Sequence, residues 1–319
     1  MTDDTDRERA VRDAVDRSQS GAPAGGHVIR DRFSADEIFQ RIIVAADHEV
    51  TASRRELLAS GLAAGFAITV TFLLYASLYA STDGDPVLSA LLYPLGFVFI
   101  ILGDYQLYTE NTLPPVALTL ERLASLPPPC SGSGGWCSSP TSPGGALGAF
   151  ALASTGVLSP DAALAAEGFA RKAIETPWWT LFSKAVFAGL IVAGVVWVDY
   201  SLRDSISRLA LVYVSFLAIP FANLYHVVVS ATEMLYLVFI GELSLAVGTT
   251  QFVLPVLLGN SIGGVVLVTV VNYFQTTERR LASARKAGRK RQLTVREWLL
   301  GSFSESGRWY VPVNGHEDD

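Results

Sequence analysis

Residues 219–233, Ile-Pro-Phe-Ala-Asn-Leu-Tyr-His-Val-Val-Val-Ser-Ala-Thr-Glu, decide the fold because they interrupt an otherwise apolar stretch. Hydrophobic residues lead into this segment from Leu209 and continue beyond it to Phe239. A proline removes one backbone donor and clashes with the preceding helical turn, and ionisable groups at membrane depth tend to mark a pathway or a bundle interior. The segment therefore predicts a broken membrane helix with a lone histidine, His226, on a permeation path.

The whole chain has the composition of a membrane protein. Half of its 319 residues are hydrophobic and only 17% are charged. Several apolar runs approach the roughly 20 residues that cross about 30 Å of hydrocarbon. The net charge of −6 says little about partners, and we expect no nucleic acid binding. The two cysteines, Cys130 and Cys137, do not have the spacing of a common zinc site, so we expect no metal and no cofactor.

Three segments are expected along the chain. Residues 1–33 form a polar, disordered tail, residues 34–277 form the membrane domain, and residues 278–319 form a basic and then polar cytoplasmic tail. Ser34-Ala-Asp-Glu37 has the form of a capping box. An amphipathic helix is predicted after it and expected to pack on the cytoplasmic face, because apolar residues follow at helical spacing: Ile38, Phe39, Ile42, Ile43 and Ala46.

Six spans are expected, and five are visible as apolar runs. They are Leu57–Ala80, a second span from Pro86 to Leu120 with a polar interruption at Gly103–Pro115, Trp179–Val198, the broken span Leu209–Leu245, and Phe252–Phe274. Basic residues at Arg54 and Arg55 and after Glu278 place both ends in the cytoplasm. An even number of spans is then required, so a third span must lie between Leu120 and Trp178.

The two interruptions resemble each other. Gln106-Leu-Tyr-Thr109 and Asn223-Leu-Tyr-His226 are about 117 residues apart, and the same shift carries the first span onto the fourth. Two three-span halves joined by an odd number of crossings are inverted relative to each other, as in many transporters. We therefore predict an all-α membrane protein with six transmembrane helices in two inverted three-helix repeats, whose second and fifth helices are broken.

The predicted third span contains a Ser/Gly/Pro-rich stretch, Pro127–Gly145, where apolar residues are expected. In another reading frame, starting at the last base of the Pro129 codon, permissible GC-rich codons read LLRVWGVVLLANLAG up to Gly144. Continued from Gly145, this resembles the sixth-span sequence LLGNSIGGVVL. A pair of compensating frameshifts or sequencing errors, and a genuine re-entrant loop, both remain open. Resequencing the gene over these codons separates them.

These features together resemble the formate/nitrite transporter family. The resemblance rests on the Gln106–Thr112 interruption, on the break at His226, and on Leu254-Pro-Val-Leu-Leu-Gly-Asn-Ser-Ile-Gly-Gly264 in the sixth span, and it covers roughly Ser34 to Gln275. It implies a homopentamer of aquaporin-like protomers in the plasma membrane, with one pore each. It also implies passage of a small monovalent anion such as formate, nitrite or hydrosulfide.

The resemblance also assigns the substrate pathway. Leu107, Tyr108 and Thr109 take the positions of the loop that narrows the pore, and His226 takes the central histidine. Asn260 matches the asparagine of the sixth span, Lys172 matches a lysine at the outer vestibule, and Lys184 matches a following basic position. The departures are Tyr108 in place of phenylalanine, Gly189 and Ser230 in place of asparagines, and two added carboxylates, Glu110 and Glu233.

These residue types suit the passage of an anion through an apolar constriction. A bare anion loses hydration there, so either donors replace water or the anion crosses as its neutral acid. Thr109 and Asn260 carry donors, and imidazole, with an unperturbed pKa of about 6.5, titrates near neutral pH. Glu110 and Glu233 have a role in proton relay or in selection against anions, or they tie the broken helix ends to neighbouring backbone donors. Gly259, Gly263 and Gly264 are expected to permit close helix packing.

Three other functions are weighed against this one. A neutral-solute pore of the same architecture would ignore pH, and a non-conducting scaffold would pass no small solute. A membrane enzyme lacks support, because no paired nucleophile and base and no metal cluster occur in the sequence.

Overall fold

The computed structural model describes residues 33, 37–42, 44–45, 54–105 and 141–264. The chain separates into a short unit, Met1–Phe33, and a main unit that begins at Ser34. In the main unit every described regular element is a helix: α3 (Arg54–Ser81), α4 (Pro86–Ala90), α5 (Leu95–Gly103), α8 (Thr141–Ser154), α9 (Pro160–Glu175), α10 (Trp178–Asp199), α11 (Ser205–Phe221), α12 (Val227–Phe239), α13 (Leu245–Val247), the π-helix η1 (Gly248–Val253) and α14 (Leu254–Ile262). The prediction of an all-helical protein is confirmed.

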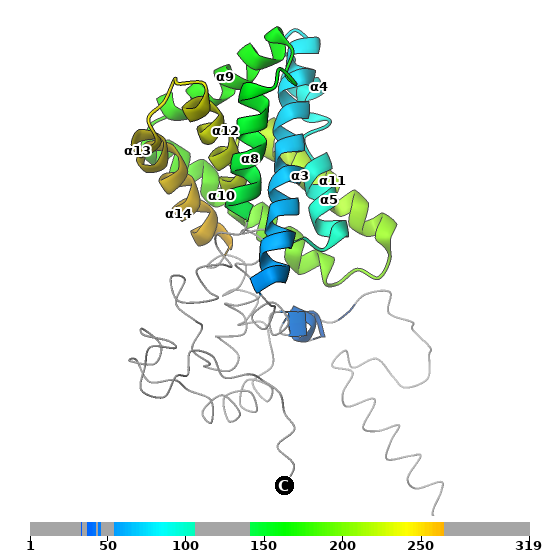
Figure 1. The fold of residues 1–319 in the computed structure, drawn as a ribbon. Coiled ribbons are helices and arrows are strands. Elements are labelled where there is room, and N and C mark those ends of the chain that lie inside the picture. Colours follow the sequence, from blue (N-terminus) through cyan, green and yellow to red (C-terminus); the bar gives the residue numbers. More distant parts are fainter. Residues whose placement is uncertain (1–32, 34–36, 43, 46–53, 106–140, 265–319) are drawn as a thin grey trace, which may run out of the picture. The chain divides into compact units, whose positions relative to one another are not determined.

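Two helix pairs pack closely, α3 with α8 and α10 with α14 (Figure 1). Small residues allow these contacts: a Cβ on Gly144 would overlap the Leu62 carbonyl oxygen of α3, and one on Gly263 would overlap the Val186 carbonyl oxygen of α10. Gly259 likewise lies against the Phe182 carbonyl. Because lipid tails provide no hydrophobic force between helices, such close backbone contact is what favours their association. The packing role expected for Gly259 and Gly263 is confirmed.

The second span consists of two helices rather than one. Asp85 occupies the N-cap of α4 and accepts hydrogen bonds from the backbone N–H groups of Val87 and Leu88, both at 2.8 Å. A turn at residues 91–94 separates α4 from α5. Helix α5 ends at Asp104, which adopts a left-handed conformation with φ 56°, and the N–H of Tyr105 donates to the Ile100 carbonyl. The span therefore stops at the polar interruption that the sequence predicts there.

The fifth span is broken, as predicted, but not at its proline. Pro220 lies inside α11, and the helix ends after it, at Phe221. Asn223 adopts a left-handed conformation with φ 53°. The N–H of Leu224 donates to the Ile219 carbonyl and that of Asn223 donates to the Pro220 carbonyl, the bonding pattern of a Schellman motif. Asparagine tolerates this conformation, so Asn223 is the residue that ends the helix.

The boundary between the fifth and sixth spans differs from the prediction. Helix α12 ends at Phe239 rather than at Leu245, because Gly241, with φ 84°, forms a second Schellman motif in which Glu242 donates to the Leu237 carbonyl. The sixth span begins at Leu245 rather than at Phe252, with Ser244 as its N-cap. It passes through the π-helix η1 before α14.

Helix α9 is an element that the sequence analysis does not predict. Ser159 is its N-cap and Pro160 its first residue, which is the position where proline suits a helix. One face is a stripe of buried alanines, Ala162, Ala166, Ala170 and Ala173, each at most 1% exposed. This face packs against α3 and α12, and the opposite face carries charged residues.

The predicted amphipathic helix is present at residues 37–42. Ile38, Phe39 and Ile42 are buried. The Phe39 ring contacts the Trp197 ring, with centroids 6.5 Å apart, and Arg41 donates to the Tyr200 carbonyl at 3.2 Å. This helix therefore packs at the C-terminal end of α10.

Four stretches of the described chain are long and apolar enough to cross a membrane: Leu58–Ser81, Pro86–Gly103, Trp178–Asp199 and Leu245–Ile262. The shorter apolar helices α11 and α12 account for the broken fifth span. In the predicted third span, α8 begins at Thr141 and ends at Ser154. The remainder of the Pro127–Gly145 stretch, the end of the sixth span and both tails lie outside the described residues.

Candidate functional site

A cavity of about 470 Å³ lies among α3, α9 and the link between α11 and α12. Its wall includes His226 from the link, Glu233 from α12 and Lys172 from α9, together with Tyr75, Tyr93 and Tyr225. Three polar residues singled out in the sequence, Lys172, His226 and Glu233, are thus brought to one cavity. They come from segments up to 61 residues apart in the chain.

His226 is buried at the wall of this cavity. It is 1% exposed and occupies the N-cap position of α12, although its side chain makes no capping hydrogen bond. The imidazole makes T-shaped contacts with two phenylalanine rings. Its centroid lies 5.0 Å from that of Phe97 and 6.2 Å from that of Phe216. Those two rings stack on each other at 3.8 Å. The helix break thus presents one titratable ring between the cavity and an aromatic pair.

Asn260 of α14 holds the backbone on both sides of His226. Its Oδ1 accepts a hydrogen bond from the Val227 N–H at 2.9 Å, and its Nδ2 donates to the Tyr225 carbonyl at 3.1 Å and to the Ala185 carbonyl at 2.8 Å. Asn260 is 3% exposed and is not part of the cavity wall. The amide therefore satisfies backbone groups that the helix break leaves without partners in the membrane.

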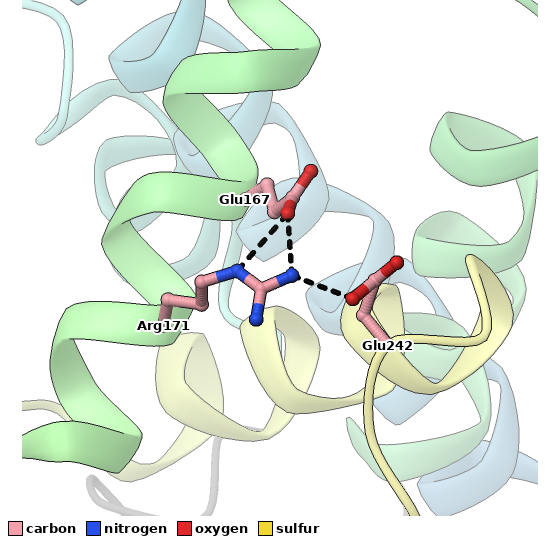
Figure 2. Close-up of polar contacts among 3 residues, drawn as sticks. All are labelled: Glu167, Arg171 and Glu242. Carbon is pink, nitrogen blue, oxygen red and sulfur yellow. Dashed lines mark hydrogen bonds and ion pairs between the residues drawn. The ribbon is translucent and has the colours of Figure 1, made fainter.

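Lys172 places a positive charge at the cavity. Its neighbour Arg171 forms ion pairs with Glu167, at 2.7 Å, and with Glu242 of the turn after α12, at 2.6 Å (Figure 2). The hydrogen bonds to Glu167 and Glu242 raise the pKa of the Arg171 guanidinium. In contrast, no carboxylate in the described part of the chain forms an ion pair with the exposed Lys172. Among the described residues that line the cavity, Lys172 is therefore the cation available to attract an anion.

The surroundings of the Glu233 carboxyl were not predicted from the sequence. Its carboxyl lines the cavity, and the residue is only 8% exposed. Within the described residues no group donates a hydrogen bond to it or pairs with its charge. The alternative that Glu233 binds backbone donors at a broken helix end therefore finds no such donor among the described residues.

Other predicted site residues lie elsewhere. Lys184 is not part of the cavity wall, and its Nζ lies 5.7 Å from the centroid of the Tyr225 ring, a cation–π distance. Gly189 packs against the backbone of Asn260. Ser230 is buried and lines the cavity. Leu107, Tyr108, Thr109 and Glu110 fall outside the described residues.

The sequence analysis did not identify the tyrosines of the cavity. Tyr75 and Tyr93 contact each other edge to face, with ring centroids 5.6 Å apart, and Tyr75 stacks on Phe169 of α9 at 4.5 Å. A Tyr-x-x-x-Tyr spacing in α3, Tyr75 and Tyr79, places two hydroxyl-bearing rings on one helix face. That spacing was the available signal.

Comparisons with known proteins identify the family. The family model described as formate/nitrite transporter matches residues 36–274. The inner membrane protein YfdC of Escherichia coli (strain K12) is 25% identical over 262 residues, which cover 78% of this chain and 82% of that protein. A pentameric formate channel with formate bound superposes with a TM-score of 0.55 at 15% identity, covering 69% of this chain and 96% of that one. An FNT family ion channel superposes with a TM-score of 0.60 at 17% identity, covering 76% and 99%. The chain belongs to the formate/nitrite transporter family.

Proposed function

We propose that this protein is a membrane permease or channel for a small monovalent anion, such as formate or nitrite, or for its conjugate weak acid, with His226 as the titrating centre of the pathway. The observation that carries the proposal is the buried His226 at the wall of a cavity that also contains Lys172. Both the family and the solved structures that resemble the chain are of transport proteins. Leu107, Tyr108 and Thr109 belong to the proposed pathway through the resemblance alone.

The proposed mechanism follows from charge and hydration. Lys172 attracts the anion, because a positive charge near a partly enclosed cavity raises the local concentration of anions. Beyond the cavity the anion must lose water, which is costly unless donors replace it or a proton neutralises it. His226 stands at that point and can supply either an N–H donor or a proton. Asn260 is a positioning residue in this scheme, since it binds the backbone next to His226.

We propose that the full architecture has six spans in two inverted repeats and assembles as a homopentamer, because a solved structure with this fold is a pentameric formate channel. Matched helix caps and matched glycine contacts in the two halves support the repeat. The domain limits, residues 34–277 between two polar tails, and the plasma-membrane location with both termini in the cytoplasm remain part of the proposal. The relative YfdC is an inner membrane protein, which supports the location.

The test is flux of formate and nitrite into proteoliposomes between about pH 5 and 8, a range that brackets an ordinary histidine. Wild type is compared with His226→Asn, because asparagine suits the N-cap of α12 and so preserves the start of the helix. His316→Asn, near the end of the sequence, is the matched control. Wild-type flux that depends on pH, and that falls at least about tenfold in His226→Asn only, supports the proposal.

Two outcomes would replace it. Flux of small uncharged solutes that ignores pH and survives His226→Asn would indicate a neutral-solute pore. The absence of flux for every anion and neutral solute tested, in protein that remains folded by thermal unfolding, would indicate a non-conducting membrane protein.

A further inference from the structure

The cavity beside the α11–α12 link is larger than a small anion needs. Its volume is about 470 Å³, which falls in the range of about 300–1,000 Å³ that is typical of pockets for organic ligands. A three-atom anion such as formate fills only a small part of this space, since one water accounts for about 30 Å³ of the liquid. The cavity can therefore hold an organic molecule, and its wall indicates which kind.

The wall of the cavity carries a carboxyl that lacks a protein partner among the described residues. Glu233 is only 8% exposed, and no described residue donates a hydrogen bond to it or forms an ion pair with it. Its carboxyl oxygens are not among the fully enclosed unpaired atoms of this part of the chain, so they are open to the cavity. Because buried polar groups are nearly always hydrogen-bonded, a ligand that donates a hydrogen bond here would supply the missing partner.

A row of four aromatic rings lines the same cavity. Phe169 stacks on Tyr75, with centroids 4.5 Å apart, and meets Tyr79 edge to face at 4.7 Å. Tyr75 in turn meets Tyr93 edge to face at 5.6 Å, and both tyrosines are near enough to Glu233 to interact with it electrostatically. The face of an aromatic ring attracts a cation, most strongly where water is excluded. A carboxyl beside such rings is suited to an ammonium group.

Lys172 places the opposite charge at the cavity without pairing with Glu233. It belongs to α9 and Glu233 to α12, and no ion pair joins these two described residues. Among the described residues that line the cavity, Lys172 is the one lysine or arginine and Glu233 is the one carboxylic acid. A small anion meets only the lysine, and a simple amine meets only the carboxyl. A molecule that carries both an ammonium and a carboxylate group meets both.

We propose that the cavity is a binding site for a small zwitterion of the amino acid type, with its ammonium group on Glu233 beside the aromatic rings and its carboxylate at Lys172. The ammonium N–H groups satisfy the buried carboxyl through charge-assisted hydrogen bonds. The ligand is neutral overall, and each of its charges meets the opposite charge on the wall. The inference goes beyond the proposed function, because binding of this ligand does not require that any anion is transported.

The first experiment is isothermal titration calorimetry of the full-length wild-type protein in detergent, near neutral pH and at constant ionic strength. The probes are glycine, 4-aminobutyrate and 6-aminohexanoate, which separate the two charges by increasing lengths. Each is compared with the amine and the carboxylate of the same chain, for example butylammonium and butyrate. The amino acid of the best length should bind at least about tenfold more tightly than its matched carboxylate, because it alone donates a hydrogen bond to the buried Glu233. It should bind about two- to fivefold more tightly than its matched amine, since a contact with the exposed Lys172 contributes less.

Single variants assign the two ends of the ligand. Glu233→Gln keeps the shape of the side chain but removes its charge, and it should weaken binding of the amino acid and the amine at least about tenfold while leaving the carboxylate unchanged. Lys172→Gln should weaken binding of the amino acid and the carboxylate about two- to fivefold while leaving the amine unchanged. Glu175→Gln, an exposed glutamate at the end of α9, is the matched control and should change none of the affinities.

Three results would overturn the inference. Equal affinity for the amino acid and its matched amine at every length would indicate a cation site, and equal affinity for the amino acid and its matched carboxylate would indicate an anion site. No binding of any probe, by protein that still unfolds cooperatively on heating, would show that the cavity does not take this class of ligand. These comparisons need only wild-type protein, so they stand even where a variant fails to fold. Because no flux is measured, failure here leaves the proposed function intact, and absence of anion flux in proteoliposomes leaves this inference intact.

Discussion

The two halves of the described chain build the same local structures at matched positions. Asp85 and Asp204 are both N-caps, and their side chains accept backbone hydrogen bonds at the starts of the second and fifth spans. Asp104 and Asn223 both end helices in the left-handed conformation. Each pair is separated by 119 residues. The Leu-Tyr sequence similarity predicts an offset of about 117 residues between the halves, and the offset observed in the backbone is two residues longer.

The halves differ in the polar side chains beside the break. In the second half Asn260 binds backbone groups of Tyr225 and Val227, and His226 lies buried between them. The position 119 residues before Asn260 is Thr141, where α8 begins. Among the described residues of the first three spans, the titratable side chains at the cavity are tyrosines, whereas the fifth span contributes an imidazole and a carboxyl. The described parts of the two halves therefore share helix caps and turns but differ in the polar side chains that they bring to the cavity.

The largest loss of stability is expected at Asn260, the residue that distinguishes the second half from the first. Asn260→Ala would leave the Val227 N–H and the Tyr225 carbonyl unpaired in a buried site, at a cost of roughly 2–6 kcal/mol, since each unsatisfied group costs about 1–3 kcal/mol. Thermal unfolding in detergent measures the loss. Thr250→Ala, which removes an exposed side-chain bond to the Ala246 carbonyl, is the control. A loss of stability no larger than that of the control would show that the Asn260 hydrogen bonds do not stabilise the break between α11 and α12.

Alanine substitutions at two glycines test whether close helix contacts contribute equally to stability in the two halves. Gly263→Ala would drive a methyl group into the Val186 carbonyl, and Gly144→Ala would do the same at the Leu62 carbonyl. We expect each to cost about 1–3 kcal/mol, as for overpacked cores. Gly194→Ala is the control, because nothing lies within 4 Å of its added Cβ and alanine favours a helix. Loss at Gly263 alone, with Gly144→Ala behaving like the control, would contradict equivalence.

The smallest effect concerns the N-cap of α11. The hydrogen bond from the Ser207 backbone N–H lowers the pKa of Asp204. A carboxyl whose folded pKa is depressed stabilises the protein above its unfolded pKa, about 3.9, and this stabilisation is lost as pH falls through the folded value. Asp204→Asn keeps the cap but removes the titration, so the melting temperatures of wild type and variant should converge below about pH 4. Parallel curves over pH 3 to 6 would refute this, and Asp85→Asn compares the other cap.

The long helices were predictable because their signal is local. The first and fourth spans begin and end within three residues of the predictions, since an uninterrupted apolar run fixes a span. Helix α9 was not predicted, although Ser159, Pro160 and the alanine spacing indicate it. The reason is that its buried face consists of small alanines, which do not form a run of large apolar residues. The end of α12 was missed because Gly241 was read as part of a membrane helix.

The site was only partly predictable. His226, Lys172 and Glu233 were singled out from the break and the family resemblance, but their meeting at one cavity depends on how α9 packs on α12. The three backbone partners of Asn260 depend on α10 and on the α11–α12 link, which no sequence spacing encodes. A hydrogen bond between distant segments becomes visible only once the tertiary structure is known.

The position of the Asn260 hydrogen bonds has a consequence for how such a pathway changes over evolutionary time. Asn260 binds main-chain atoms of residues 225 and 227, so these hydrogen bonds support the break without using the side chain at position 226. Structural support and chemical selection are thus assigned to different residues. A lineage can exchange the residue that meets the cargo while the membrane-spanning framework stays intact, and cargo preference becomes a property that few substitutions can redirect.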